Sequence, residues 1–341
     1  MLDKIRAASS KEELFVVVGA LGQTGLGFTT KVDVYADEID ASTNAMYVSI
    51  PSLTLDQSYY DNATFAGIQS DYRKYISTIM RLSRYLDDDN SSSDIAENVI
   101  IDMQFELANA TNVANADEED QSHPIMVNDA LDAYPLSFGQ VAKGLGIVKN
   151  SSLIHEAKFI FSSLDAFDFI EDLISRKELE ELKLYLAYVY VDASATRLSK
   201  EFYQAYFDFN GRALGGETTM PPRSSTCLTV ETSNLPELIG KCYAQKMIDS
   251  TQDEDIHRMV RLIRTALRNH MNELTWLDGP TRKAAQGKLA KVDDMIGGPK
   301  KDMTYSYTLD SQAFFENVKT IALDSWATSV KKIGNRVDRS E

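Results

Sequence analysis

The chain has 341 residues, a mass of 38.1 kDa and a formal net charge of −16 at pH 7. This charge disfavours nucleic acid as a partner, because affinity for nucleic acid comes largely from clustered Lys and Arg that release counterions from phosphates. Hydrophobic residues make up 43% and charged residues 25% of the chain, which is typical of globular proteins and excludes disordered and fibrous classes. The longest apolar run, residues 184–191, is too short to cross a bilayer, and residues 1–14 lack the apolar core of a signal peptide, so we expect no membrane segment.

The first notable segment, residues 15–27 (FVVVGALGQTGLG), carries Gly19, Gly22 and Gly25 at the spacing of a dinucleotide-binding loop. Such a loop follows a strand and opens a helix, so that the helix N-terminus faces the pyrophosphate. Residues 9–13 (SSKEE) instead contain two overlapping capping boxes, Ser9 to Glu12 and Ser10 to Glu13, which predict a helix start before the glycines. We therefore expect a helix that ends in glycines. The alternative, a nucleotide-dependent oxidoreductase, predicts binding of NAD(P).

Residues 31–50 then predict a short β-hairpin, because residues 31–39 alternate between apolar and polar and a turn-like DASTN follows before AMYVSI. The rest of the chain shows helical periodicity, and we see no tandem repeat and no linker that would demand a domain boundary. The predicted fold is mainly α, a single multi-helical domain over residues 1–341 with one small β-hairpin near residues 31–50. The expected helical features are stripes at 68–86 and 255–274, capping boxes at Ser175–Glu178 and Thr251–Glu254, an aromatic core segment at 201–216 that ends on glycines, and a stripe through Ala285, Leu289, Val292 and Ile296 that ends at Gly297.

Residues able to perform chemistry are few. His155 and Glu156 begin the zinc-binding pattern H-E-x-x-H, but Phe159 stands where the second histidine should be. His257 and His270 lie about 220° apart around one predicted helix, so they cannot share a metal. The acidic loops at 87–94 and 117–121 are expected to be solvated. The residues alone therefore predict no catalytic group and no metal ligand.

The modification sites leave the cellular compartment open. Cys227 and Cys242 are too few for a disulfide framework and lack C-x-x-C spacing, so two thiols are favoured over one bridge. Four N-x-S/T triplets would accept glycans in a secreted protein, although such triplets are common by chance. The candidate glycosylation sites are Asn62, Asn90, Asn109 and Asn150.

Residues 274–299 (LTWLDGPTRKAAQGKLAKVDDMIGGP) resemble a segment of the neprilysin-like zinc metallopeptidases, which include the endothelin-converting enzymes. In that family a helix carries Leu-x-Trp-Met-Asp, then Thr-Arg, Ala and Lys-Leu, and closes with Ile-Gly-x-Pro. The segments 105–111, 133–141 and 221–227 are similar to the family in the same order. The matching residues that we take as a structural signature are Trp276, Asp278, Thr281, Arg282, Lys288, Gly297 and Pro299.

This resemblance covers nearly the whole chain and implies the N-terminal helical domain of a zinc metalloendopeptidase, truncated at both ends. In the family this domain encloses a chamber that admits peptides, while H-E-x-x-H and a third ligand, a glutamate, lie in a C-terminal domain. The resemblance thus implies zinc and peptide substrates for the complete protein, no zinc ligand and no activity in this chain alone, and an extracellular or membrane-anchored location. The alternative is a stand-alone helical module that binds peptides or proteins, or a pseudoenzyme.

Overall fold

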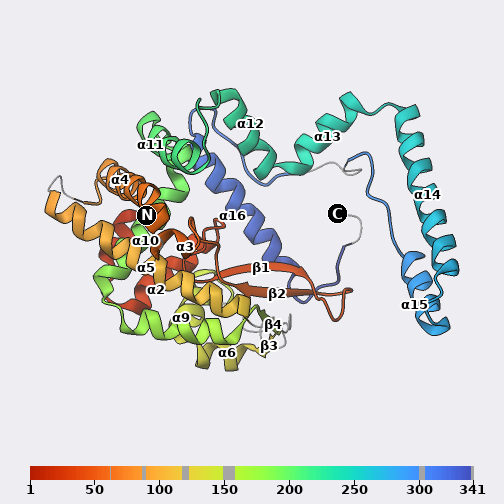
Figure 1. Cartoon of the computed structure of the whole chain (residues 1–341), viewed down its shortest axis with the longest axis horizontal. Helices are drawn as coiled ribbons and strands as arrows, with labels where there is room; N and C mark the ends of the chain where they lie inside the picture. The colour runs from red at the N-terminus through yellow and green to blue at the C-terminus, as the bar shows by residue number, and fades with distance from the viewer. Residues whose placement is uncertain (62, 87–89, 117–122, 149–157, 299–303, 339–341) are drawn as a thin grey trace. The chain divides into compact units, whose positions relative to one another are not determined.

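The computed structural model of the chain describes residues 1–61, 63–86, 90–116, 123–148, 158–298 and 304–338. These residues form two compact units (Figure 1). The large unit comprises Met1–Met220 and Tyr307–Ser340, and the small unit comprises Pro221–Ser306. The fold is mainly α, as predicted, and no helix among the described residues is long and apolar enough to cross a bilayer. Whether the two units fold as one domain stays a prediction.

The large unit is built on long helices that share one apolar core, in which α5 (Asn90–Ala116) contacts α4 (Ala66–Leu82), α9 (Leu164–Arg176) and α10 (Leu179–Ser194). The chain leaves this unit after α11 and a π-helical segment, and it returns to it with α16. Its helices are α1 (Leu2–Ala7), α2 (Lys11–Gly22), α3 (Ser58–Asp61), η1 (Ala63–Phe65), α4 (Ala66–Leu82), α5 (Asn90–Ala116), α6 (Val127–Ala133), η2 (Pro135–Gln140), α7 (Val141–Gly144), α9 (Leu164–Arg176), α10 (Leu179–Ser194), η3 (Ala195–Arg197), α11 (Lys200–Tyr206), η4 (Phe207–Leu214) and α16 (Phe314–Lys332).

The predicted hairpin is confirmed as β1 (Lys31–Ala36) and β2 (Asn44–Ser49), which pair antiparallel with Val32 opposite Val48. The sheet is larger than the sequence indicated, because β3 (His123–Met126) and β4 (Lys158–Phe161) extend it in the order β1-β2-β4-β3. Strand β4 runs parallel to β2 and antiparallel to β3. The prediction of a hairpin alone therefore missed strands β3 and β4.

The opening glycines end a helix, as predicted, and the structure shows why glycine is needed there. Helix α2 crosses α7 so closely that a Cβ on Gly19 would lie 2.1 Å from the Val141 carbonyl oxygen, and one on Gly144 would lie 2.1 Å from the Val16 carbonyl oxygen. Beyond the helix, Gly25 has a φ of +80°, which favours glycine. The glycine spacing thus serves helix packing and a turn, and α2 is not preceded by the strand that a nucleotide loop requires.

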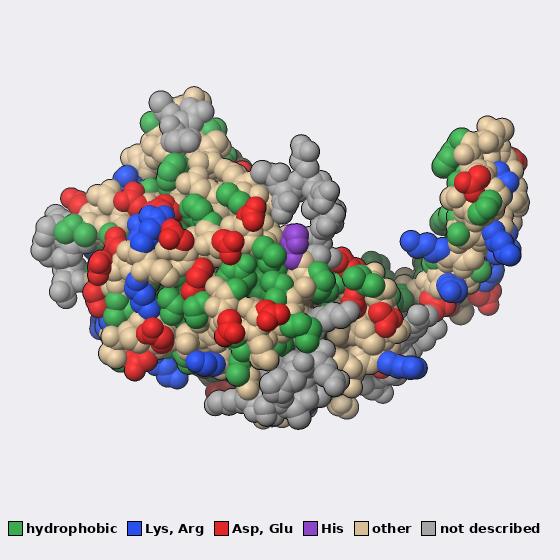
Figure 2. Space-filling view, turned by 90° about the horizontal axis from the view of Figure 1, so that it is seen from below, with side chains coloured by type: hydrophobic (Ala, Val, Ile, Leu, Met, Phe, Trp, Pro, Cys, Tyr) green, Lys and Arg blue, Asp and Glu red, His purple; other side chains and the backbone are tan. Residues whose placement is uncertain are grey.

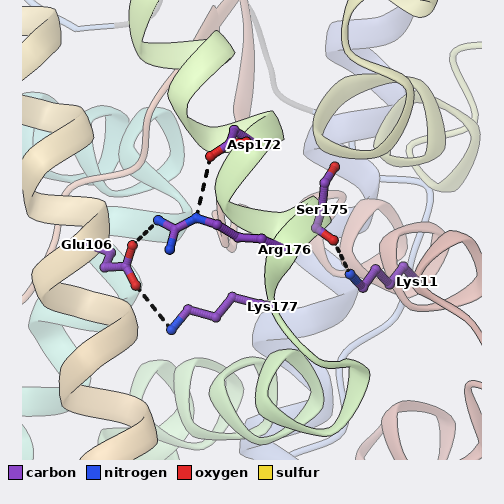
Figure 3. A network of polar contacts seen from close by, with 6 residues as sticks. All are labelled: Lys11, Glu106, Asp172, Ser175, Arg176 and Lys177. Carbon is purple, nitrogen blue, oxygen red and sulfur yellow. Dashed lines mark hydrogen bonds and ion pairs between the residues drawn. The ribbon is translucent and has the colours of Figure 1, made fainter.

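A polar network joins α5, α9 and α2 at the edge of this core (Figure 3). The Glu106 carboxylate accepts hydrogen bonds from Arg176 and from Lys177 Nζ, the latter at 3.1 Å, and Arg176 also pairs with Asp172. Lys11 Nζ donates to the Ser175 carbonyl oxygen at 2.6 Å. Partial burial opposes ionisation of Glu106, but the two cationic donors outweigh it and hold the pKa of this carboxyl below its usual range. The network therefore fixes the end of α9 against two neighbouring helices.

The small unit has four helices and almost no core of its own. They are α12 (Arg223–Asn234), α13 (Pro236–Met247), α14 (Ser250–Glu273) and α15 (Gly279–Leu289). Among the described residues of this unit, Leu289 is the one side chain that is buried, at 8% exposed. Helix α14 agrees with the predicted stripe at 255–274, but α15 ends at Leu289, so Val292 and Ile296 do not extend its stripe as predicted.

The predicted capping boxes were partly wrong in position. Helix α2 is capped by Ser10, whose side chain accepts from the Glu13 N–H, while Glu13 accepts from the Ser9 N–H at 2.8 Å. Ser10 is therefore the N-cap, as the box from Ser10 to Glu13 predicted, but Glu13 accepts from the Ser9 N–H instead of the Ser10 N–H, so neither predicted box forms in full.

The other two capping predictions are wrong. Ser175 lies within α9, and α10 is capped by Glu178 with Glu181. Helix α14 begins earlier than predicted, because Asp249, in an extended conformation, exchanges hydrogen bonds with Gln252. Several polar residues near a helix start can cap it, and local sequence does not choose among them.

We predict that Gly19→Ala destabilises the large unit by about 3 kcal/mol, because the new methyl group meets backbone atoms of α7 that cannot rotate away. Gly67→Ala is the matched control, since a Cβ at this exposed position in α4 meets nothing within 4 Å and alanine favours the helix by up to about 1 kcal/mol. Urea unfolding of the two variants measures both effects. Equal stability of the two variants would contradict the close crossing of α2 and α7.

Candidate functional site

The described residues contain no group of three or more His, Cys, Asp or Glu side chains placed to hold a metal ion. His155 and Glu156, which begin the incomplete zinc pattern, lie outside the described residues. His257 and His270 both lie on α14, and His257 Nε2 is 3.7 Å from the carboxylate of Asp253. The described part of the chain thus offers no ligand set for zinc, and we assign no step of a metal-assisted reaction to it.

The structural signature places three of its residues together where α14 passes into α15. Asp278 caps α15 by accepting a hydrogen bond from the Thr281 N–H at 2.8 Å. This hydrogen bond holds the pKa of the Asp278 carboxyl below its usual range. Because the cap lies at the N-terminus of α15, the negative charge also complements the helix dipole.

Arg282 ties the turn between the two helices together. Its guanidinium donates to three backbone carbonyl oxygens: Nε to Met271 at 2.9 Å, and Nη2 to Leu274 at 2.8 Å and to Leu277 at 2.7 Å. These carbonyl groups end α14 or follow it, so they lack helical partners. A planar, permanently charged group with several donors suits this task, whereas a lysine offers a single ammonium. Arg282 thus joins the end of α14 to the start of α15.

The end of the signature segment turns on two glycines. Gly297 and Gly298 have φ values of +81° and +88°, so side chains there would be strained. A Cβ on Gly298 would lie 3.0 Å from Ala244 Cβ in α13, so the glycine lets the segment approach that helix. Arg264 of α14 donates to the Val292 carbonyl oxygen and pairs with Asp294 at 2.5 Å, which holds the preceding residues along α14.

The remaining signature residues do not join this cluster. Trp276 is 76% exposed, and Lys288 is also exposed on α15. Pro299 lies outside the described residues. The signature thus contains Asp278, Thr281, Arg282 and Gly297, which shape the turns of this segment, and an exposed aromatic side chain that the fold of the small unit does not use.

The most conspicuous feature of the small unit is an exposed apolar face on α14. Met259, Ile263 and Leu267 succeed one another at intervals of four residues, and they are 61%, 59% and 42% exposed. In Figure 2, hydrophobic side chains lie beside Lys and Arg side chains on the part at the right that contains α14 and α15. None of the side chains of α14 is buried within the described unit, which is unusual for so strongly amphipathic a helix. We call these three residues the α14 face.

A small pocket of about 350 Å³ lies at the start of α14, where Asp249, Asp253, Lys241 and Gly297 line it. Its acidic groups already have structural tasks, since Asp249 caps α14 and Asp253 lies beside His257. The pocket is therefore a poor candidate for catalysis.

The candidate modification sites are only partly described. Asn62 and Asn150 lie outside the described residues, and Asn90 begins α5. Asn109 lies within α5, where its Oδ1 accepts from Gln57 Nε2 at 2.6 Å. Both cysteines are free thiols, with Cys242 exposed and Cys227 half-buried. Use of any of these sites for glycans stays a prediction.

Comparison with known proteins decides the family. The family model described as peptidase family M13, for its N-terminal part, matches residues 1–299. The chain belongs to peptidase family M13. The predicted neprilysin-like resemblance is thereby confirmed, and so is the prediction that the chain corresponds to the N-terminal part of such a peptidase.

The relatives agree with this assignment. The chain is 21% identical over 333 residues to mouse membrane metallo-endopeptidase-like 1 and 19% identical over 337 residues to human neprilysin. Each match covers 90% of this chain. It covers 43% of the mouse protein and 44% of the human protein. The fold resembles the zinc metalloprotease Zmp1 of Mycobacterium tuberculosis in complex with an inhibitor, with a TM-score of 0.87 and 22% identity, over 100% of this chain and 51% of that one. PepO from Lactobacillus rhamnosis gives a TM-score of 0.82 at 18% identity, over 100% and 54%. This M13 chain thus spans less than half the length of the curated relatives compared here.

We predict that Arg282→Ala accelerates amide hydrogen exchange in the last turn of α14 and the first turn of α15 about 30-fold. This corresponds to a loss of about 2 kcal/mol for charged hydrogen bonds to three carbonyl groups. Arg282→Lys should fall between the variant and the wild type, because one ammonium cannot serve all three acceptors. The control is Lys283→Ala, which removes the same charge from an exposed neighbour. If Lys283→Ala exchanges as fast as Arg282→Ala, the clamp is not what holds the turn.

Proposed function

We propose that this M13 chain acts as the N-terminal part of a zinc metalloendopeptidase and forms its substrate chamber together with a C-terminal part that carries the zinc. The α14 face is the observation that carries this proposal. Long amphipathic helices in water are stabilised mainly by burying their apolar side. Since the small unit leaves Met259, Ile263 and Leu267 uncovered, these side chains fit an interface with a further part of the protein.

The lengths of the relatives support the same arrangement. The structural matches cover 100% of this chain, but only 51% of the Zmp1 chain and 54% of the PepO chain. The C-terminal part is the source that we propose for the zinc ligands and for the glutamate that activates water in metal-assisted peptide hydrolysis. The described residues of this chain would contribute walls, substrate contacts and support. Peptides are the proposed substrates, and an extracellular or membrane-anchored location is the proposed site of action.

A stand-alone binding module is the second candidate, because the exposed α14 face could instead bind an external peptide or protein. The two candidates differ in what they expect of the native protein. A peptidase requires additional mass and a chelator-sensitive activity, whereas a module requires neither.

We predict that native protein captured from its source cells with an antibody against residues 1–341 cleaves an internally quenched peptide. A zinc chelator should abolish the cleavage and added zinc should restore it, because hydrolysis would depend on the metal. The purified chain of residues 1–341 serves as the control and should cleave nothing. Native protein of about 38.1 kDa without chelator-sensitive activity would favour the binding module.

We further predict that Met259 is oxidised by peroxide several-fold more slowly in the native protein than in the chain of residues 1–341. An interface would cover its thioether, which is 61% exposed in the small unit. Met126 of the large unit, 51% exposed, reports the peroxide dose in both samples. Equal oxidation of Met259 in both samples would show that the α14 face is not the covered surface, whatever the outcome of the activity measurement.

A further inference from the structure

A cluster of tyrosines in the core of the large unit contains one carboxyl group, that of Asp192 near the end of α10. Tyr75 of α4 donates a hydrogen bond from its hydroxyl group to Asp192 Oδ1 at 2.5 Å. This is the one hydrogen bond that the Asp192 side chain makes within the described part of the chain, and none of the ion pairs there includes it. The carboxyl group thus lacks the cation that normally accompanies a buried carboxylate.

The groups around Asp192 are aromatic and neutral. Tyr72 and Tyr75 face it from α4, Tyr188 and Tyr185 from its own helix, and Tyr206 from α11. Burial raises the pKa of each of these phenols, so none of them is a charged partner near neutral pH.

No basic side chain of the described residues pairs with the Asp192 carboxylate either. Arg197, the next basic residue after Asp192 in the sequence, has a pKa that is lowered by burial alone, with no contribution from Asp192.

The hydroxyl groups of Tyr60, Tyr72 and Tyr188 have hydrogen-bond partners other than Asp192. Tyr72 donates to Gln104 Oε1 at 2.5 Å, so the Tyr188 hydroxyl at 2.7 Å must donate to Tyr72. Tyr60 donates to the same Gln104 oxygen. Tyr75 is the tyrosine of this cluster that donates to the carboxyl group.

The cluster also anchors the segment through which the chain leaves the large unit. Phe209 of η4 stacks on Tyr75, with ring centroids 5.3 Å apart, and on Tyr72 at 4.8 Å. Tyr206 at the end of α11 packs edge-on against Tyr75. A charge that appears on Asp192 is therefore placed against the same rings that hold α11 and η4.

We propose that the Asp192–Tyr75 pair is a pH-sensitive element that makes the large unit, and above all its α11–η4 segment, more stable in mildly acidic than in neutral solution. Protonated Asp192 keeps the hydrogen bond without a buried charge. Ionised Asp192 keeps one donor and loses part of its hydration, because the residue is half-buried. The effect runs opposite to the usual one, in which acid removes stabilising carboxylates.

The sign follows from linkage. Burial raises the pKa of Asp192 to about 6 in the folded protein, against 3.8 for an unperturbed Asp, and the hydrogen bond from Tyr75 only partly opposes this rise. The folded state therefore binds the proton more tightly than the unfolded state. The contribution of Asp192 to stability is fully present below about pH 4 and is lost as the pH rises through about 6.

The test compares the wild-type chain with Asp192→Asn in urea at half-unit steps from pH 4.5 to pH 7.5. The unfolding constant of the wild type, divided by that of the variant, should increase by up to about tenfold per pH unit below the folded pKa and level off near pH 7. Asp132→Asn, at an exposed site in α6, changes the net charge equally and should give a flat ratio. A flat ratio for Asp192→Asn as well would overturn the proposal.

A second measurement covers the case in which Asp192→Asn fails to fold. Carboxyl NMR of the wild-type chain should show one Asp titrating near pH 6, and Tyr75→Phe should move that titration to higher pH because it removes the stabilising donor. Amide exchange in residues 200–214, corrected for the intrinsic pH dependence of exchange, should be faster at pH 7.5 than at pH 5.5. Absence of an Asp titrating near pH 6 would refute the proposal.

Discussion

The burial of apolar surface is very unevenly divided between the two units of this M13 chain, and the functional interpretation depends on that imbalance. The large unit fills its core with aromatic and aliphatic side chains from nearly every helix. The small unit has four helices of normal length and buries Leu289 alone among its described residues. Because helices of this kind depend on packing for their stability, this lack of a core is the basis of the interface proposed for the α14 face.

Within the small unit, polar contacts rather than an apolar core hold the helices in place. Arg282 binds three carbonyl oxygens between α14 and α15, Arg264 holds the segment after α15, and capping side chains fix the starts of both helices. Such contacts define geometry but contribute little net stability when they are exposed to solvent. They can therefore orient the α14 face for a partner without making the unit stable alone.

The sequence predicted the class of fold and several of the helices, because periodic apolar residues over long stretches leave little choice of structure. Helix α14 and the hairpin β1–β2 were found in this way. Strands β3 and β4 were missed because each has four residues, too few for a visible alternation, and their pairing joins segments far apart in the chain. Helix starts were misplaced where several capping residues lie close together, as at Ser175 and Thr251.

The candidate site was predictable only in part. The resemblance identified the signature residues, but nothing in their spacing indicated that Arg282 binds carbonyl groups whereas Trp276 faces solvent. The exposure of Met259, Ile263 and Leu267 could not be predicted from the sequence either. An amphipathic pattern shows that a helix has an apolar side, but it does not show what covers that side.

The glycines near residue 20 also show that a local sequence pattern does not determine its own function. Their spacing matches a phosphate-binding loop, and the decisive information lies in α7, where Gly144 meets Gly19 across a helix crossing too tight for any side chain. A motif of small residues states only that something approaches the backbone closely. Whether that neighbour is a phosphate or another helix is decided by residues far away in the sequence. The strand and helix that flank a motif are therefore the better guide to its function.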